Sequence, residues 1–380
     1  MKISFWFSFL GTVYTYFGYP LLLSMVSAIF SKPVKKKASE PFVSIIISAF
    51  NEEKAIEKKL LNLLNLNYPE GKFEILVGSD GGSDQTDEIV SRFRSTRIRF
   101  FKFIQNFGKP HVLSALIEEA KGDIVIFTDS RQEFDREAIS ALVKNFEDPK
   151  VGCVSGALYF KNTGDSAAGI SEGMDVYWRY EKWLRKRESQ LNSMLGATGA
   201  IYAIRKSLFP KYLPNDILVD DMYIPFEIIK KGYRAIFEPE ACAFDKPSEK
   251  GKQELKRKTR TLAGNYQIFT SFPELFNPFT SPIAWQLFSH KFMRLMVPLF
   301  LMIQLVSNLF LLDNPFYLAF LIGQVLFYGL AILEIRQAGK QKKGFGYIPY
   351  TFCLLNYSAL AGLIQFLNGR QKANWEKAYA

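Results

Sequence analysis

Five aspartates in this sequence stand where an apolar run gives way to a polar turn or to a helix. Asp80 and Asp84 lie in one such turn, Asp129 ends a later run, and Asp220 and Asp221 precede a segment with helical spacing. Carboxylates held at such places can ligate a divalent cation, accept hydrogen bonds from hydroxyl groups, or take a proton from one. The alternative interpretation is structural, because Asp is also common in surface turns and at helix N-caps.

The segments that would position these aspartates alternate between strand and helix patterns. Runs rich in β-branched residues predict strands that are buried on both faces, as in a parallel sheet. Regular alternation of strands with helices favours a doubly wound α/β domain, in which ligands bind beyond the carboxyl ends of the strands. We therefore expect the aspartates to face a crevice. The expected strands are 42–48, 74–79, 98–103 and 123–128, and the expected helices are 53–65, 86–93, 108–120 and 223–231.

This order of elements also suits a nucleotide-binding domain, although the usual phosphate-binding loops are missing from the sequence. No Gly-x-Gly-x-x-Gly opens the first helix, and no Gly-x-x-x-x-Gly-Lys-Ser/Thr loop occurs. A nucleotide site would therefore depend on the acidic strand ends. Acidic residues can lie near a diphosphate when a divalent metal ion stands between them.

Four apolar segments without charged residues flank the α/β region: Phe5–Phe30, Leu295–Leu312, Phe316–Leu333 and Tyr347–Leu367. A helix needs about 20 apolar residues to cross a bilayer, so each is a candidate membrane segment. The middle two are separated by three residues and predict a helical hairpin. Tyr347–Leu367 contains Pro, Asn and Gln residues, and the sequence leaves open whether it crosses fully or is re-entrant or interfacial.

Basic residues follow the first apolar segment and indicate its orientation. Phe5–Phe30 is longer than the core of a signal peptide and no small-residue cleavage site precedes Lys32–Lys37, so we expect an uncleaved anchor. The positive-inside rule places Lys32–Lys37 and the following domain in the cytoplasm. The net charge of +11 lies largely beside the apolar segments, which favours anionic lipid over nucleic acid as a partner. Three scattered cysteines favour a reduced compartment.

Several motifs follow one another in order between Val43 and Asn265. They are Val43–Glu53 with its Asn-Glu turn, Ser79–Thr86 (SDGGSDQT), Asn106–Lys109 (NFGK) with Ala115-Leu116, Gly122–Arg131, Gly199-Ala200, Asp220-Asp221, and Arg257–Thr261. In this order they resemble the motifs of the family 2 glycosyltransferases, whose nucleotide-sugar domain has the GT-A fold. The sequence departs from the family at Ser79 and Arg131, which stand where the family has Asp, at Ala49, where Pro is common, and at Asp220, where Glu is usual. It also lacks the Gln and Trp of the processive motif around Arg260.

The resemblance implies a role for each candidate site residue. Asp221 would be the general base that takes the proton of the acceptor hydroxyl, and Asp129 would ligate Mg²⁺ or Mn²⁺. The residues implied in donor binding are Asn51, Glu52, Asp80, Lys109 and Arg260, and those implied in the acceptor or sugar pocket are Gly199, Ala200 and Asp220.

We therefore expect an inverting glycosyltransferase in the bacterial cytoplasmic membrane, with a nucleotide-sugar donor and a membrane-associated, lipid-linked acceptor of cell-envelope or exopolysaccharide synthesis. The alternatives are a processive polysaccharide synthase and an inactive, membrane-tethered nucleotide-binding protein. The expected division is a membrane anchor (1–30), a basic linker (31–41), a GT-A domain (42–270), an interfacial segment (271–294), a C-terminal membrane region (295–367) and a basic tail (368–380).

Overall fold

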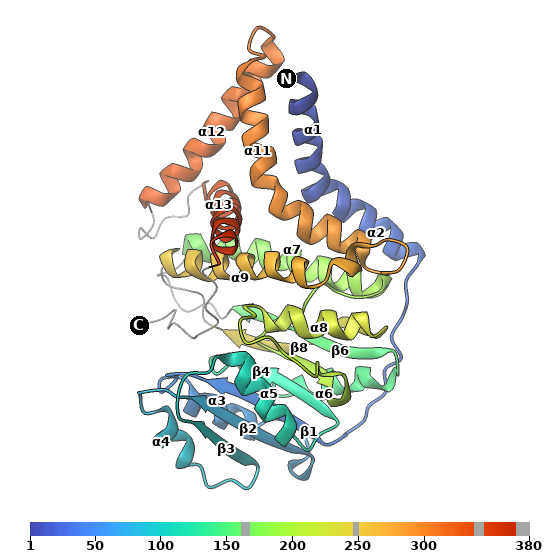
Figure 1. Cartoon of the computed structure of the whole chain (residues 1–380), viewed down its shortest axis with the longest axis vertical. Helices are drawn as coiled ribbons and strands as arrows, with labels where there is room; N and C mark the ends of the chain where they lie inside the picture. Colours follow the sequence, from blue (N-terminus) through green and yellow to red (C-terminus); the bar gives the residue numbers. More distant parts are fainter. Residues whose placement is uncertain (161–167, 246–250, 338–345, 370–380) are drawn as a thin grey trace. The chain divides into compact units, whose positions relative to one another are not determined.

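The computed structural model describes residues 1–160, 168–245, 251–337 and 346–369, which form two compact units (Figure 1). The first, which we call the sheet unit, contains Phe30–Lys161 and Arg185–Lys246. The second, the helical unit, contains Met1–Ile29, Asn162–Leu184 and Pro247–Arg370. The helices at the end of the expected 42–270 domain therefore cluster with the apolar segments. The tail 368–380 lies almost wholly outside the described residues.

The sheet unit is built on an eight-stranded mixed sheet with the strand order β3-β2-β1-β4-β7-β6-β8-β5. The pairs β1–β2, β1–β4, β2–β3 and β6–β8 are parallel, whereas β4–β7, β6–β7 and β5–β8 are antiparallel. The strands are β1 (Val43–Ala49), β2 (Phe73–Asp80), β3 (Ile98–Phe103), β4 (Ile124–Thr128), β5 (Glu133–Phe134), β6 (Val151–Phe160), β7 (Tyr202–Arg205) and β8 (Arg234–Asp245).

The first half of the sheet confirms the predicted α/β alternation. Every residue of β1, β2 and β4 is buried, as expected for strands with central apolar runs in the middle of a sheet. Helix α5 packs on β1 and β2. The helices of this unit are α3 (Ile56–Leu64), α4 (Thr86–Ser91), α5 (Lys109–Glu119), α6 (Ala138–Val143) and α8 (Asp220–Lys230), and the long helix α7 (Ala168–Leu191) enters it with its last residues.

Among its described residues, the helical unit contains four helices long and apolar enough to cross a membrane, in agreement with the four predicted segments. They cover Lys2–Ile29, Ala284–Leu309, Pro315–Glu334 and Tyr347–Leu367. The predicted hairpin is formed by α11 and α12. The elements are α1 (Lys2–Val13), α2 (Tyr19–Ile29), most of α7, α9 (Gly251–Ser271), α10 (Ala284–Gln286), α11 (Met293–Leu309), α12 (Pro315–Gln337) and α13 (Tyr347–Leu367).

Two short π-helical segments, Tyr14–Gly18 and Leu287–Phe292, interrupt these apolar helices and meet each other. The Tyr14 hydroxyl lies 2.7 Å from the Ser289 hydroxyl and accepts a hydrogen bond from the Trp285 indole. Nearby, the buried Glu181 of α7 pairs with Arg294, and His290 lies 3.5 Å from the same carboxylate. Part of the expected interfacial segment 271–294 is thus a helix continuous with α11.

Candidate active site

Three predicted site residues meet at the carboxyl edge of the sheet, although they are far apart in the sequence. Asp129 follows β4, Lys109 is the first residue of α5, and Asp220 is the first residue of α8. The Lys109 ammonium lies 3.0 Å from Asp129 Oδ1 and 3.3 Å from Asp220 Oδ2. Burial alone would lower the pKa of Lys109, but the nearby carboxylates raise it above its ordinary value. Lys109 therefore supplies a permanent positive charge among acidic groups.

Asp221 lies in the same cluster, and its surroundings suit a proton acceptor. Its Oδ2 accepts a hydrogen bond of 2.9 Å from the backbone N–H of Gly199. Burial and the neighbouring charge of Asp220 raise the pKa of Asp221 to about 6, although Lys109 and the Gly199 N–H oppose that rise. A carboxylate with a pKa nearer to neutrality is a stronger base than an ordinary one, yet it stays ionised at pH 7.

Gly199 lies beside the side chains of Asp221, Asp129 and Lys109. A Cβ atom at this position would lie 3.5 Å from Asp221 Oδ2, 3.6 Å from Asp129 Oδ2 and 3.9 Å from Lys109 Nζ. The adjacent Ala200 is buried, and its carbonyl accepts a hydrogen bond of 2.8 Å from the Thr128 hydroxyl. The Gly199-Ala200 backbone is thereby tied to the end of β4, with the side-chain position of Gly199 facing the charged cluster.

Asp80 ends β2 and is fully buried. Its two carboxylate oxygens accept hydrogen bonds of 2.8 Å each from the backbone N–H groups of Phe107 and Gly108. Burial raises the pKa of Asp80, while the two N–H groups act against that rise. Because Gly108 has a φ of 91° and immediately precedes Lys109, Asp80 fixes the turn from which Lys109 projects. Contact of Asp80 with a donor stays a prediction.

Asn51 and Glu52 join the turn after β1 to the turn after β2. Asn51 has a φ of 56°, and its Oδ1 accepts hydrogen bonds from the N–H groups of Ser83 (2.8 Å) and Asp84 (3.3 Å). The Glu52 N–H donates to the Thr86 hydroxyl (2.8 Å). These bonds make the two turns one framework at the strand ends. Donor binding by Asn51 and Glu52 also stays a prediction.

Arg131, which stands where the family usually has a second aspartate, lies beside Asp245. Its guanidinium lies 3.9 Å from Asp245 Oδ2, and the same oxygen accepts a hydrogen bond of 2.7 Å from Gln132. In the described ranges no three His, Cys, Asp or Glu side chains are grouped so that they could hold a metal ion. Asp129, 34% exposed, nevertheless fits Mg²⁺ or Mn²⁺ when phosphate oxygens of a substrate supply further ligands. Arg260 lies on α9, in the helical unit.

Two buried residues near the cluster were not predicted from the sequence. Lys59 of α3 is 1% exposed and donates to the Thr128 hydroxyl (2.8 Å) and to the Gln132 carbonyl (2.6 Å). Burial lowers the pKa of Lys59 to about 7, although Asp129 and other carboxylates counteract the effect. Tyr202 of β7 is buried against Phe127, and its hydroxyl has no hydrogen-bond partner within the described residues. The sequence patterns of α3 and β7 do not distinguish Lys59 and Tyr202 from the neighbouring residues of the same elements.

A mixed α/β sheet with charged side chains gathered at its strand ends is the arrangement expected of a GT-A transferase, and comparisons with known proteins agree on the fold. The family description "Glycosyl transferase family 2" matches residues 44–213. A mannosyltransferase structure, PcManGT from Pyrobaculum calidifontis with GDP-Man and Mn²⁺, superposes with a TM-score of 0.73 at 22% identity, covering 95% of this chain and 97% of the other. Residues 44–213 therefore match a family 2 glycosyltransferase domain, and the fold is of the GT-A type.

Two curated proteins are similar to this chain in sequence. It is 26% identical over 288 residues to a probable glycosyltransferase, YdaM, of Bacillus subtilis, covering 73% of this chain and 67% of YdaM. It is 25% identical over 262 residues to the poly-β-1,6-N-acetyl-D-glucosamine synthase of Staphylococcus aureus, covering 68% of this chain and 62% of the synthase. The chain thus spans about two thirds of the length of these relatives.

Proposed function

We propose that this chain transfers one sugar, with inversion, from a nucleotide-sugar donor to a membrane-associated, lipid-linked acceptor in cell-envelope or exopolysaccharide synthesis. The observation that carries the proposal is the position of Asp221. Its carboxylate, whose pKa burial and Asp220 raise to about 6, lies beside the backbone of Gly199, in one cluster with Lys109 and Asp129. That arrangement supplies a base and a cation within one site, as a displacement at a sugar carbon requires.

The proposed reaction is a single displacement. The Asp221 carboxylate accepts the proton of the acceptor hydroxyl as its oxygen forms a bond to the anomeric carbon of the donor sugar. The bond from that carbon to the phosphate oxygen breaks, and the nucleoside diphosphate leaves with the bonding electrons. Because attack and departure occur on opposite faces, the anomeric configuration is inverted. The Gly199 N–H holds the Asp221 carboxylate in place.

The donor side of the site would carry the positive charge that the leaving diphosphate needs. Lys109 provides a fixed ammonium, and Arg260 is proposed as a second cation. Mg²⁺ or Mn²⁺ bound at Asp129 would supply further charge to the phosphate oxygens. The framework of Asn51, Glu52 and Asp80 is proposed to border the nucleotide, with Ala200 and Asp220 toward the sugar and acceptor.

We also propose a multi-pass position in the bacterial cytoplasmic membrane, with the sheet unit in the cytoplasm. Support comes from the four helices of membrane-crossing length and from the basic run Lys32–Lys37 after the first of them. A nucleotide sugar from the cytoplasm would then meet a lipid-linked acceptor at the inner leaflet. Fusion reporters placed in the loop between α11 and α12 and in the sheet unit would test this orientation, since they should report opposite sides.

A processive polysaccharide synthase is the second candidate, favoured by the similarity to the staphylococcal synthase. The chain lacks the Gln and Trp of the processive motif around Arg260, which favours single transfer instead. Product length on a single nucleotide sugar separates the two candidates. One added sugar per acceptor supports our proposal, and a ladder of longer products supports the synthase.

The experiment that tests the proposal is a screen of purified full-length protein against UDP- and GDP-sugars with Mg²⁺ or Mn²⁺ and a membrane-lipid extract as acceptor. Once a donor is found, Asp221→Asn should abolish turnover while nucleotide binding is retained. Asp216→Asn is the matched control, because Asp216 is an exposed aspartate in the segment just before α8. Full turnover in Asp221→Asn would refute the assigned base, and no turnover of any donor by the parent would favour the inactive nucleotide-binding protein.

A further inference from the structure

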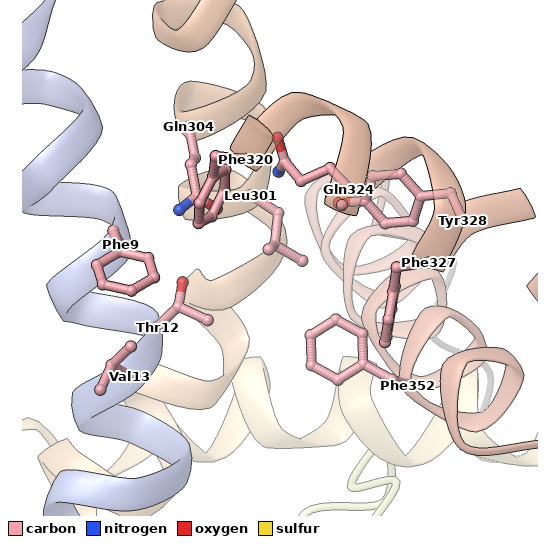
Figure 2. A pocket seen from close by; sticks show the side chains of 11 residues that line it. Phe9, Thr12, Val13, Leu301, Gln304, Phe320, Gln324, Phe327, Tyr328 and Phe352 are labelled. Carbon is pink, nitrogen blue, oxygen red and sulfur yellow. The ribbon is translucent and has the colours of Figure 1, made fainter. Parts of the chain in front are cut away.

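A cavity of about 320 Å³ lies among the apolar helices of the helical unit. Figure 2 shows Phe9 and Thr12 of the first helix facing Phe327 and Phe352 of α12 and α13 across it, with α11 completing the wall. The volume falls within the range of about 300–1,000 Å³ that is usual for small-molecule sites. Its residues come from all four helices of membrane-crossing length, and the aspartate cluster of the sheet unit contributes none.

Two glutamines of the cavity wall carry buried polar atoms that lack a partner. Gln304, on α11, is 3% exposed, and its Nε2 has no hydrogen-bond partner in the described part of the chain. The same holds for Oε1 of Gln324 on α12. Figure 2 shows both side chains at the cavity. A buried polar atom without a partner costs roughly 1–3 kcal/mol, so two of them at one cavity point to a ligand that satisfies them.

The chemistry of the wall restricts this ligand. The Nε2 of Gln304 needs an acceptor and the Oε1 of Gln324 needs a donor, and a hydroxyl or a secondary amide offers both. Thr12 already donates its hydroxyl proton to the Ser8 carbonyl, and most of the remaining wall is aromatic or aliphatic. A hydrocarbon chain fills the apolar part of such a wall favourably. The ligand that fits is an amphiphile with a long apolar chain and a hydroxyl or amide group.

We propose that this cavity binds a membrane lipid, whose hydrocarbon chain packs on the aromatic wall and whose hydroxyl or amide group pairs with Gln304 and Gln324. The inference rests on the proposed membrane placement of the four helices. It assigns a second site to the protein, distinct from the sugar-transfer cluster in the sheet unit.

Glycines of α12 offer a matched pair of variants. Gly323 lines the cavity, and a Cβ atom built on it meets nothing within 4 Å, so Gly323→Leu should fill the cavity without displacing the chain. Gly329 lies on the same helix in equally open surroundings but does not line the cavity, which makes Gly329→Leu the control. The double variant Gln304→Leu with Gln324→Leu keeps the side-chain size and removes the two amides.

The probes are a long-chain alcohol carrying a diazirine and the matching diazirine alkane, each photolysed with membranes that contain the full-length protein. Peptides of α11 and α12 are then analysed for the label. Wild type and Gly329→Leu should be labelled at cavity residues, with a preference for the alcohol. The glutamine double variant should lose this preference by about two- to tenfold, the range for one net hydrogen bond. Gly323→Leu should lose labelling by both probes.

Equal labelling of Gly323→Leu and wild type would overturn the inference, as would an unchanged alcohol preference in the double variant. Alkaline extraction of the same membranes separates this failure from failure of the proposed placement. Protein that stays in the membrane pellet but shows no cavity labelling rejects the lipid site alone. Protein released by alkali rejects the membrane placement and the lipid site together.

Discussion

Replacing Gly199 with alanine tests the assigned cluster most directly, because the change adds a single methyl group at a known place. The new Cβ would lie 3.5 Å from Asp221 Oδ2 and 3.6 Å from Asp129 Oδ2, which are ordinary van der Waals contacts. The backbone of Gly199 lies outside the left-handed region, and its N–H can still donate to Asp221. Folding should therefore be preserved, and the smaller entropy of the unfolded chain would add about 0.4–1 kcal/mol of stability.

Activity should respond in the opposite direction. The methyl group occupies space that a sugar or acceptor oxygen must enter to reach Asp221, and a displacement of about 1 Å costs on the order of 10²-fold in rate. That factor corresponds to about 2.7 kcal/mol of transition-state stabilisation. The assay is the kcat/KM of sugar transfer, together with the thermal unfolding temperature of the same preparation.

The control for Gly199→Ala is Gly71→Ala, since Gly71 is exposed and a Cβ there meets nothing within 4 Å. It should leave the rate unchanged and show the same small gain in stability, because the unfolded chain loses the same entropy. Activity of Gly199→Ala within about threefold of the parent would refute a reacting position beside this glycine, because no such displacement would then have occurred. A lost activity accompanied by a lower unfolding temperature would contradict the expected preservation of the fold.

Three further predictions follow from the charged and buried groups. Because Asp221 must be ionised to accept a proton and its pKa is raised to about 6, kcat/KM should fall as the pH drops through about 6; a flat profile between about pH 5 and 7 would contradict its role. Asp80→Asn should lower the free energy of unfolding by about 1–3 kcal/mol, measured by denaturant titration, since one of two buried N–H groups loses its acceptor; an unchanged value would contradict this. Burial lowers the pKa of Lys59 to about 7 in the folded protein, so the unfolded chain binds more protons than the folded one above pH 7. The free energy of unfolding of the parent should therefore rise relative to that of Lys59→Met as the pH increases from about 7 to 10. Parallel curves of stability against pH for the two proteins would refute this prediction.

The parts of the fold that were predicted from the sequence are those whose pattern is local. Strands β1, β2 and β4 each contain a run of three or more consecutive apolar residues, and a run of that kind has few stable places other than the middle of a sheet. The four apolar helices were likewise evident from length and composition. Strands β5–β8 were not predicted, since β5 has two residues and the antiparallel pairing of β7 depends on neighbours distant in the chain.

The site residues likewise differ in how far the local sequence could predict them. Asp129 and Asp221 were identifiable as candidates because they end a strand and begin a helix, but their common border with Gly199 arises only when β4 and the segment before α8 come together. Lys59 was missed because it occupies one position of a helix whose apolar spacing is set by Ile56, Leu60 and Leu63. Its burial depends on the segment after β4, which covers it. Such tertiary effects leave no trace in a local pattern.

The hydrogen bonds of Asn51 and Asp80 have a consequence for how the carboxyl edge of the sheet opens. Asn51 ties the turn after β1 to that after β2, and Asp80 ties the end of β2 to the loop after β3. Three successive loops are therefore joined by side chains, and none can detach without breaking bonds to the next. In amide hydrogen exchange, the N–H groups of Ser83, Phe107 and Gly108 should exchange at a common rate, as members of one cooperative unit.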